Sequence, residues 1–159
     1  MLLTGVLIID ATDRLGWVAG RVLADLGADV IKLEPPGNDR GGADWRAFNV
    51  NKRVLELDLQ ASSDRARLED LLRAADICLL TPSDSSVCLD PQALRENYPR
   101  LVVVAIRPFG GVGPRSAWKA SDIELMAPPA AMSSMALAFH ALRGPTPPNG
   151  RMATTTNRG

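Results

Sequence analysis

The fold class of this chain is predicted mainly from the stretch Val6–Glu34, VLIIDATDRLGWVAGRVLADLGADVIKLE. It opens with an apolar run, residues 6–9, which is typical of a strand buried on both faces of a sheet. A polar turn over residues 10–16 follows, and a second strand is predicted over residues 29–33. Strand, helix and strand in this order favour a right-handed parallel crossover.

The helix between these two strands is predicted over residues 17–26. Val18, Val22 and Leu26 recur four residues apart with Leu23 beside them, so this apolar side is expected to face the core. Gly27 directly follows and is expected to end the helix, because glycine readily adopts the left-handed conformation that closes one.

Further apolar runs and capping signals continue this alternation. Residues 35–47 are expected to form a polar loop. Strands are predicted over residues 54–59, 76–80 and 101–106, and helices from Ser62 or Ser63, from Asp90-Pro91 and from Ser121. The expected fold class is therefore α/β: a Rossmann-like parallel sheet with helices on both faces.

The composition changes toward the carboxyl end of the sequence. No Asp or Glu follows Glu124, and the last residues are rich in Ala, Pro, Thr and Gly. Such a segment offers little apolar surface to offset the entropy of ordering it. The expected organisation is one domain over residues 1–133 and a divergent, disordered tail over residues 134–159.

Bulk composition excludes several function classes. The 159 residues carry 18 basic and 18 acidic side chains, which argues against a general nucleic-acid binder or a membrane-surface binder. No signal peptide is expected, and no run of about 18 apolar residues predicts a membrane span. Two cysteines, Cys78 and Cys88, are too few for a disulfide scaffold and favour a reduced, cytoplasmic setting. With His140 they show no ligand spacing, so no metal is expected.

The turn after the first strand superficially matches a dinucleotide-binding unit. Glu34 stands where such a unit places its ribose-binding acid. The turn has only Gly16 and Gly20, however, with the bulky Trp17 and Val18 between them, so a pyrophosphate could not approach the backbone closely. NAD binding is therefore disfavoured, and Gly20 is interpreted as a position where helix and sheet pack closely.

Several motifs, in order and in phase, resemble the family III CoA-transferases, also called the CaiB/BaiF family. That family includes formyl-CoA and carnitine CoA-transferases and α-methylacyl-CoA racemases. The matching segments are Asp10-x-Thr12 with Gly16 and AGRVLADLGADVIKLEPPGND, FNVNKRVLELD ending at Asp58, LRAADI from Leu72, NYPRLV from Asn97, PFGGVGP from Pro108, and Lys119-Ala-Ser-Asp122. The resemblance covers residues 5–133 and indicates the family without indicating a substrate.

The resemblance implies a site for coenzyme A or acyl-CoA and a carboxylate acceptor, and so a role in acyl-CoA metabolism. CoA carries phosphates, which require cations and backbone amides near helix starts. Positions expected to bind it by similarity are Arg14, Leu15, Gly16, Arg40, Leu57, Thr81 and Lys119, with Pro35, Gln60 and Pro82 beside them. The cations considered as phosphate partners are Arg40, Lys52, Arg53 and Lys119. The family also implies an interlocked homodimer, or here a second chain that completes the fold.

The same resemblance implies a nucleophilic Asp some tens of residues after the Gly-rich loop. Because Glu124 is the last acid in the sequence, no catalytic residue is assigned, and the isolated chain is expected to be inactive. Asp122 is expected to cap a helix. The racemases place a histidine near the position of Ser121, and His140 lies outside the matching stretch, so racemase chemistry is not supported. Thr81-Pro82 also replaces the Asn-Phe pair of the family.

Three functions remain open at this point. The chain is a CoA-transferase family member, or half of a split one, that needs another polypeptide for turnover; or it is a non-catalytic CoA- or nucleotide-binding protein; or it is an interaction domain without a ligand.

Loss of acids and a Pro/Thr-rich end suggest that the sequence is truncated or frame-shifted. If so, the coding sequence downstream should contain a family-like segment in another reading frame. Sequencing that region tests the idea, and finding no such segment in any frame would remove it.

Overall fold

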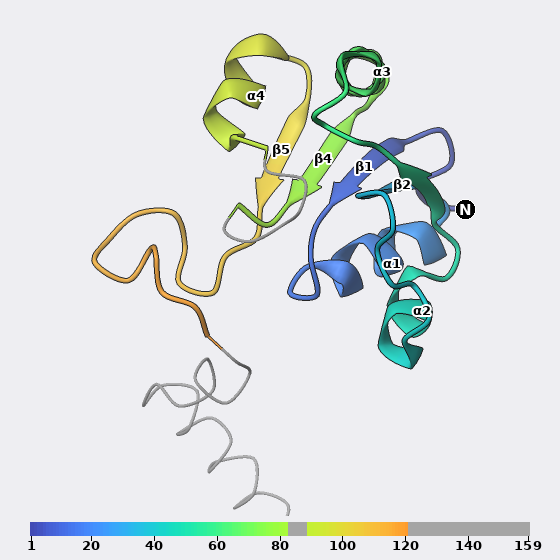
Figure 1. Ribbon diagram of the computed structural model, residues 1–159, viewed down its shortest axis with the longest axis horizontal. Coiled ribbons are helices and arrows are strands. Elements are labelled where there is room, and N and C mark those ends of the chain that lie inside the picture. The colour runs from blue at the N-terminus through green and yellow to red at the C-terminus, as the bar shows by residue number, and fades with distance from the viewer. Residues whose placement is uncertain (83–88, 121–159) are drawn as a thin grey trace, which may run out of the picture. The chain divides into compact units, whose positions relative to one another are not determined.

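Five parallel strands form one sheet in the order β3-β2-β1-β4-β5 (Figure 1). The computed structural model describes residues 1–82 and 89–120. The strands are β1 (Leu7–Ala11), β2 (Asp29–Glu34), β3 (Arg53–Glu56), β4 (Ile77–Leu80) and β5 (Val102–Ala105), and the helices are α1 (Trp17–Asp25), α2 (Ala43–Asn49), α3 (Ser62–Ala74) and α4 (Pro91–Asn97). All of them belong to one compact unit, residues 1–118, and residue 119 begins a second unit. The predicted α/β class is confirmed.

Strand β1 lies at the centre of the sheet and is buried on both faces, as its apolar sequence predicts. Ile9 pairs with Ile31 of β2 on one side and with Cys78 of β4 on the other. Successive side chains of a strand point to opposite faces, so Ile8 and Ile9 enter different core clusters. Both isoleucines are fully buried. The strand begins and ends slightly later than residues 6–9.

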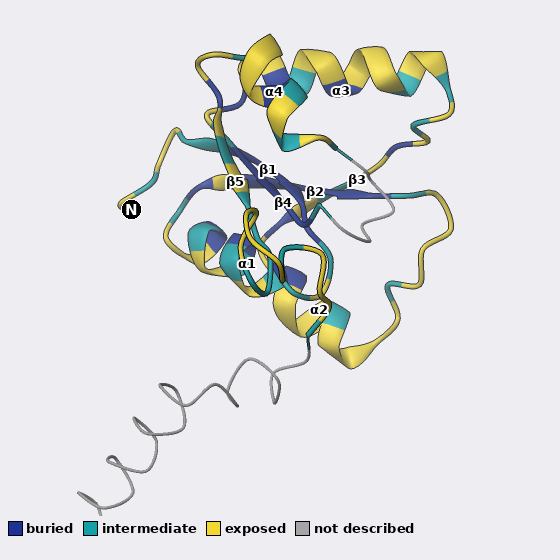
Figure 2. Ribbon diagram, turned by 90° about the vertical axis from the view of Figure 1, so that its left-hand side faces the viewer, coloured by how far each residue is buried: buried dark blue, intermediate teal, exposed yellow. Residues whose placement is uncertain are grey.

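Helices cover both faces of the sheet, as predicted (Figure 2). Helices α1 and α2 lie on one face, and α3 and α4 lie on the other. The change of face follows from the strand order. The chain moves from β1 outward to β2 and β3, then returns through α3 to β4 on the far side of β1. Because parallel crossovers are right-handed, reversing the direction places the connecting helix on the opposite face.

The predicted buried side of α1 is only partly right, because Leu23 packs against the core while the other three apolar residues are exposed. Val18 and Val22 are each 52% exposed and Leu26 is 38% exposed, whereas the buried residues of the helix are Gly20 and Ala24. The two small residues let the helix lie close to the sheet, and this turns the valines outward. Helical spacing of apolar residues was a correct signal for a helix but not for the face that it buries.

Other boundaries differ from the prediction in smaller ways. Helix α2 was missed inside the loop expected over residues 35–47, where Gly, Pro and Asp favour turns. Helix α3 begins at Ser62, but its N-cap is Ala61 and no side chain caps it, so the predicted serine cap is wrong. Asp90 does cap α4, because its side chain accepts a hydrogen bond from the Gln92 amide at 3.0 Å.

Gly27 ends α1 as predicted, with a φ of +102°. The helix expected from Ser121, the cap assigned to Asp122 and His140 lie outside the described residues. The boundary at residue 133 stays a prediction.

Replacing Gly20 with alanine should destabilise the protein. A Cβ atom there would lie 2.2 Å from Oδ2 of Asp10 and 3.0 Å from Nζ of Lys52, two buried side chains that form an ion pair. We expect Gly20→Ala to lower the free energy of unfolding by roughly 1–3 kcal/mol through overpacking, even after the helix-propensity gain of about 1 kcal/mol. Urea unfolding measures this. Gly111→Ala is the control, because nothing lies within 4 Å of that Cβ. Equal stability of the two variants would contradict the close approach.

The thiol of Cys78 should be almost unreactive in the folded protein. Burial in β4 and the nearby Asp10 carboxylate raise its pKa from 9.0 to about 12. At pH 8 its thiolate is therefore roughly a thousandfold scarcer than that of an ordinary thiol, and thiolate is the reactive form. In a Cys88→Ser background, a colorimetric thiol reagent should titrate one thiol only after denaturation. Rapid labelling of the native protein would refute this.

The same shift links Cys78 to alkaline stability. The folded state holds the thiol proton more tightly than the unfolded state, so the stabilisation is complete below pH 9.0 and falls as the pH rises toward about 12. Comparing Cys78→Ser with its parent over that range isolates the effect.

Candidate functional site

The candidate site lies where the carboxyl ends of β1 and β4 meet. Strand order reverses at β1, and open α/β sheets bind ligands outside the carboxyl ends of strands at such a switch point. The connection from β1 to α1, residues 12–16, together with Trp17, the first residue of α1, is called the β1–α1 turn below. The amide of Asp13 donates to Oγ1 of Thr81 at 2.9 Å, which ties this turn to the end of β4.

Hydrogen bonds within the β1–α1 turn use most of its backbone amides. The Thr12 amide donates to Oδ1 of Asp10 at 3.0 Å, and the Leu15 amide donates to Oδ1 of Asp13 at 2.9 Å. The amides of Gly16 and Trp17 donate to the Asp13 carbonyl at 3.0 and 3.1 Å. A phosphate at this turn would therefore be met mainly by side chains, and not by the backbone amides that the sequence led us to expect.

Arg14 is the cation that the turn presents to solvent. Its guanidinium pairs with Asp44 of α2 at 2.6 Å, and the two side chains are 76% and 57% exposed. Exposed pairs of this kind contribute at most about 1 kcal/mol, so Arg14 can exchange Asp44 for an anionic ligand at little cost. Leu15 is half-buried beside it, and Gly16 is buried against Thr12, where a Cβ atom would meet the threonine side chain at 2.6 Å.

Arg40, Leu57 and Thr81 lie in different settings. Arg40 pairs with Glu56 at the carboxyl end of β3, and its Nε has no hydrogen-bond partner among the described residues. Leu57 is 1% exposed within the core, so only its backbone could contact a ligand. Thr81 is also 1% exposed, and its hydroxyl is engaged by the turn.

Lys119 belongs to the second compact unit. The structure therefore does not relate it to the β1–α1 turn, and its proposed contact with CoA stays a prediction.

Two cations considered as phosphate partners are placed elsewhere. The side chain of Lys52 is fully buried and pairs with Asp10 at 2.8 Å. Arg53 is the first residue of β3, so it lies at the amino ends of the strands, whereas the turn lies at their carboxyl ends. It pairs with Asp29 at 2.5 Å. The structure does not support either residue as a phosphate partner at the turn, because Lys52 is buried and Arg53, although exposed, lies at the amino ends of the strands.

A network of buried charges lies directly beneath the turn. Lys32 of β2 is 2% exposed, and its Nζ lies 3.5 Å from Oε1 of Glu34. Burial lowers the pKa of Lys52 from its ordinary value, and the Asp10 carboxylate opposes that shift. Sequence reasoning missed this network, although a lysine inside the apolar run VIKLE was a visible signal.

Both carboxylate oxygens of Glu34 already accept hydrogen bonds, which argues against binding of a dinucleotide ribose by this residue. Its Oε1 accepts from Nε1 of Trp45 at 2.9 Å, and its Oε2 accepts from Nδ2 of Asn38 at 2.5 Å. The residue is 3% exposed, so it offers no accessible oxygen to a ribose. Gly20 packs against Asp10 instead of lining the turn, which agrees with the interpretation of close packing.

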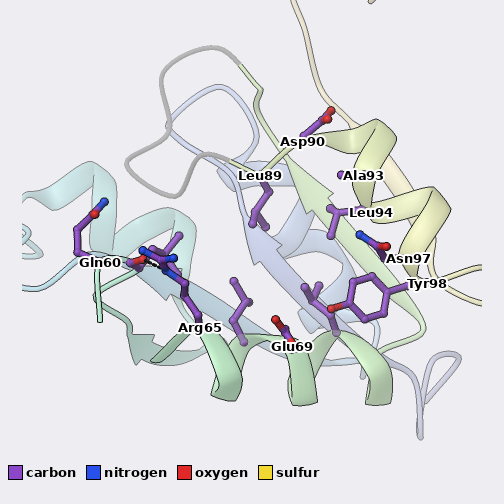
Figure 3. A pocket seen from close by; sticks show the side chains of 12 residues that line it. Gln60, Arg65, Glu69, Leu89, Asp90, Ala93, Leu94, Asn97 and Tyr98 are labelled. Carbon is purple, nitrogen blue, oxygen red and sulfur yellow. Dashed lines mark hydrogen bonds between the residues drawn. The ribbon is translucent and has the colours of Figure 1, made fainter. Parts of the chain in front are cut away.

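A groove of about 460 Å³ runs between α3 and α4 (Figure 3). Its floor is apolar, with Leu68, Leu72 and Leu94, and polar side chains including Gln60 and Arg65 line its edges. The resemblance had placed Gln60 beside CoA. The groove is a concave surface with an apolar lining, the kind of surface that binds small ligands.

The described part of the chain contains no helix long and apolar enough to cross a membrane. In the same residues no three His, Cys, Asp or Glu side chains form a group that could hold a metal ion.

Proteins named as CoA-transferases, or as probable ones, resemble this chain over about 70% of its length. It is 39% identical over 126 residues to a probable CoA-transferase, Rv1866, of Mycobacterium tuberculosis, which covers 71% of this chain and 16% of that protein. It is 30% identical over 130 residues to the cinnamoyl-CoA:phenyllactate CoA-transferase of Clostridium sporogenes, covering 70% of this chain and 32% of that enzyme. The chain thus spans about a third or less of the length of these relatives.

Solved structures share the fold. A CAIB/BAIF family protein from Brucella suis superimposes with a TM-score of 0.68 at 26% identity, over 77% of this chain and 38% of that one. The Rv3272 protein of Mycobacterium tuberculosis gives a TM-score of 0.66 at 25% identity, over 89% of this chain and 52% of that one.

The model of the family described as CoA-transferase family III matches residues 3–149. The match continues past residue 133, where the motif resemblance ends. Because it spans most of the sequence and agrees with both the relatives and the fold, the chain belongs to CoA-transferase family III.

Proposed function

We propose that this chain is the CoA-binding portion of an enzyme that moves CoA between an acyl-CoA and a carboxylic acid. The family match over residues 3–149 is the observation that carries the proposal. Relatives with 30% identity are named for transfers between different acids, among them succinate–glutarate and formyl-CoA:oxalate pairs. These names share CoA and differ in the acids, so the proposal specifies CoA and leaves the acyl group and the acceptor open.

The geometry of the carboxyl edge supports a CoA site. Arg14 is exposed and weakly paired, so its guanidinium is available to a phosphate. Arg40 lies at the same edge of the sheet, beside the end of β3. The α3–α4 groove, with its leucine floor, would accept an apolar portion of the ligand. Arg14 and Arg40 would bind the anionic phosphate end of CoA, and the α3–α4 groove would bind its apolar arm.

The chemical step requires an accessible carboxylate, and the two buried acids of the described residues, Asp10 and Glu34, do not provide one. Transfer through the family's nucleophilic Asp would form a mixed anhydride with the acyl group and release CoA as a thiolate. Asp10 and Glu34 are both buried and hydrogen-bonded. Because the resemblance places the nucleophilic Asp some tens of residues after the Gly-rich loop, and no acid follows Glu124 in this sequence, we infer that another polypeptide supplies it.

Calorimetry with CoA tests the proposal. The chain should release or absorb heat on titration with CoA and show a saturable isotherm, and acetate should give none. Absence of binding at millimolar CoA would overturn the proposal and leave an interaction domain as the better description. Transfer activity in the isolated chain would overturn the inference that the nucleophile lies elsewhere.

Neutralising Arg14 should weaken CoA binding. Because a hydrogen bond to a charged group contributes about 1.5–3 kcal/mol, Arg14→Gln should raise the dissociation constant by roughly tenfold or more. Lys119→Glu should also weaken binding if that residue meets a phosphate, as the resemblance implies. Arg53→Gln is the matched control, since Arg53 is exposed, pairs with Asp29 and lies at the amino end of β3, away from the turn. Unchanged affinity in Arg14→Gln would place the phosphates elsewhere.

A further inference from the structure

We propose that Lys32 and Lys52 are positioning residues that clamp the two ends of the β1–α1 turn through its backbone carbonyls. The proposal rests on the proposed function, because it assigns these lysines to the turn that presents Arg14 to CoA. It differs from the sequence-based assignment of Lys52 as a phosphate partner. Neither ammonium would touch the ligand.

Lys32 holds the first end of the turn. It stands opposite Asp10 in the register of β1 and β2. Its Nζ donates to the Thr12 carbonyl at 2.7 Å and to the Leu33 carbonyl at 3.0 Å, and it lies 3.5 Å from the Asp10 carbonyl. An ammonium has three donors, and here they bind strand ends beneath the turn and not solvent.

Lys52 holds the other end of the turn. Its Nζ donates to the Trp17 carbonyl at 2.9 Å, to Oδ2 of Asp10 at 2.8 Å and to Oδ1 of Asn49 at 2.9 Å. All three donors are used, and the side chain is fully buried. The lysine arrives from the segment between α2 and β3, so it ties the start of α1 to a different part of the chain.

Asp10 joins the two clamps. Its Oδ2 accepts from Lys52, and its Oδ1 accepts from the Thr12 amide at 3.0 Å and from the Thr12 hydroxyl at 2.6 Å. One carboxylate thus contacts the first residue of the turn directly and the last residue through Lys52. The turn is held at both ends by groups that solvent does not reach.

Stability alone does not account for this arrangement. Burying an ion pair costs free energy of desolvation, and apolar side chains of similar size often stabilise a core as well or better. A fully satisfied polar network does select one conformation, because any shift leaves a buried charge unpaired. The conformation selected here is that of the turn, whose amides are already used internally and whose shape sets where Arg14 stands.

Hydrogen exchange of the intact 159-residue chain, together with CoA calorimetry, tests the proposal. Lys32→Met removes the clamp at Thr12 while Glu34 keeps Trp45 and Asn38 as partners. The amides of Gly16 and Trp17, which bond to the Asp13 carbonyl, are the reporters. We expect them to exchange at least about tenfold faster than in wild type while amides of β4 keep their rates, because local opening is controlled locally. CoA affinity should fall at least fivefold.

Two further variants keep the test decisive. The double variant Asp10→Asn/Lys52→Met removes the second clamp and leaves no unpaired buried charge at these positions. It replaces Lys32→Met in the test if that variant does not fold. Leu101→Ala, a core truncation at the amino end of β5, controls for general loss of stability. It should lower the melting temperature without selectively loosening the turn or weakening CoA binding.

The outcomes separate the two claims. Unchanged protection of Gly16 and Trp17 in both clamp variants overturns the clamp. A loosened turn with wild-type CoA affinity overturns the positioning role alone. Failure of the wild-type chain to bind CoA overturns the proposed function and the positioning role with it, while the exchange rates still decide whether the clamp exists.

Discussion

The buried ion pair between Asp10 and Lys52 is the interaction on which the rest of this structure depends. Both side chains are excluded from solvent, and an unpaired charge at either position would cost several kcal/mol. The pair joins the end of β1 to a residue 42 positions further along the chain. Helix α1 must pass over it, and only a residue without a side chain leaves the room, which is why Gly20 faces the sheet and the valines face outward.

The same pair explains the character of the candidate site. Negative and positive charges beneath the β1–α1 turn are fully hydrogen-bonded, so they shape the backbone and are not available to a ligand. The turn's own amides are likewise engaged. Among the described residues, Arg14 above the turn, Arg40 beside the end of β3 and the groove between α3 and α4 are accessible to a ligand. This is a different solution from a dinucleotide-binding turn, in which glycines expose the backbone to phosphate.

Membership of CoA-transferase family III accounts for the sheet and for the order of the motifs. The relatives are named for transfers that involve different acids, and this chain spans a minor part of their length. A portion that holds CoA, the shared reactant, fits that variety, because the choice of acid can then be made by residues elsewhere. Under the proposed function, the chain binds the CoA that all these transfers share, and another polypeptide supplies the carboxylate that completes the acyl chemistry.

The sequence by itself determined the alternation of strands and helices, the burial of β1 and the cap of α4 at Asp90, because local apolar patterns and capping chemistry act over a few residues. The ordered motifs also indicated the family. Only the tertiary structure decided which side of α1 is buried, that Arg53 lies at the far edge of the sheet, and that Lys52 is internal. These depend on strand order and on contacts between distant residues, which residue type and spacing do not encode. The sequence alone does not show whether a lysine side chain is exposed to water or paired with a buried carboxylate.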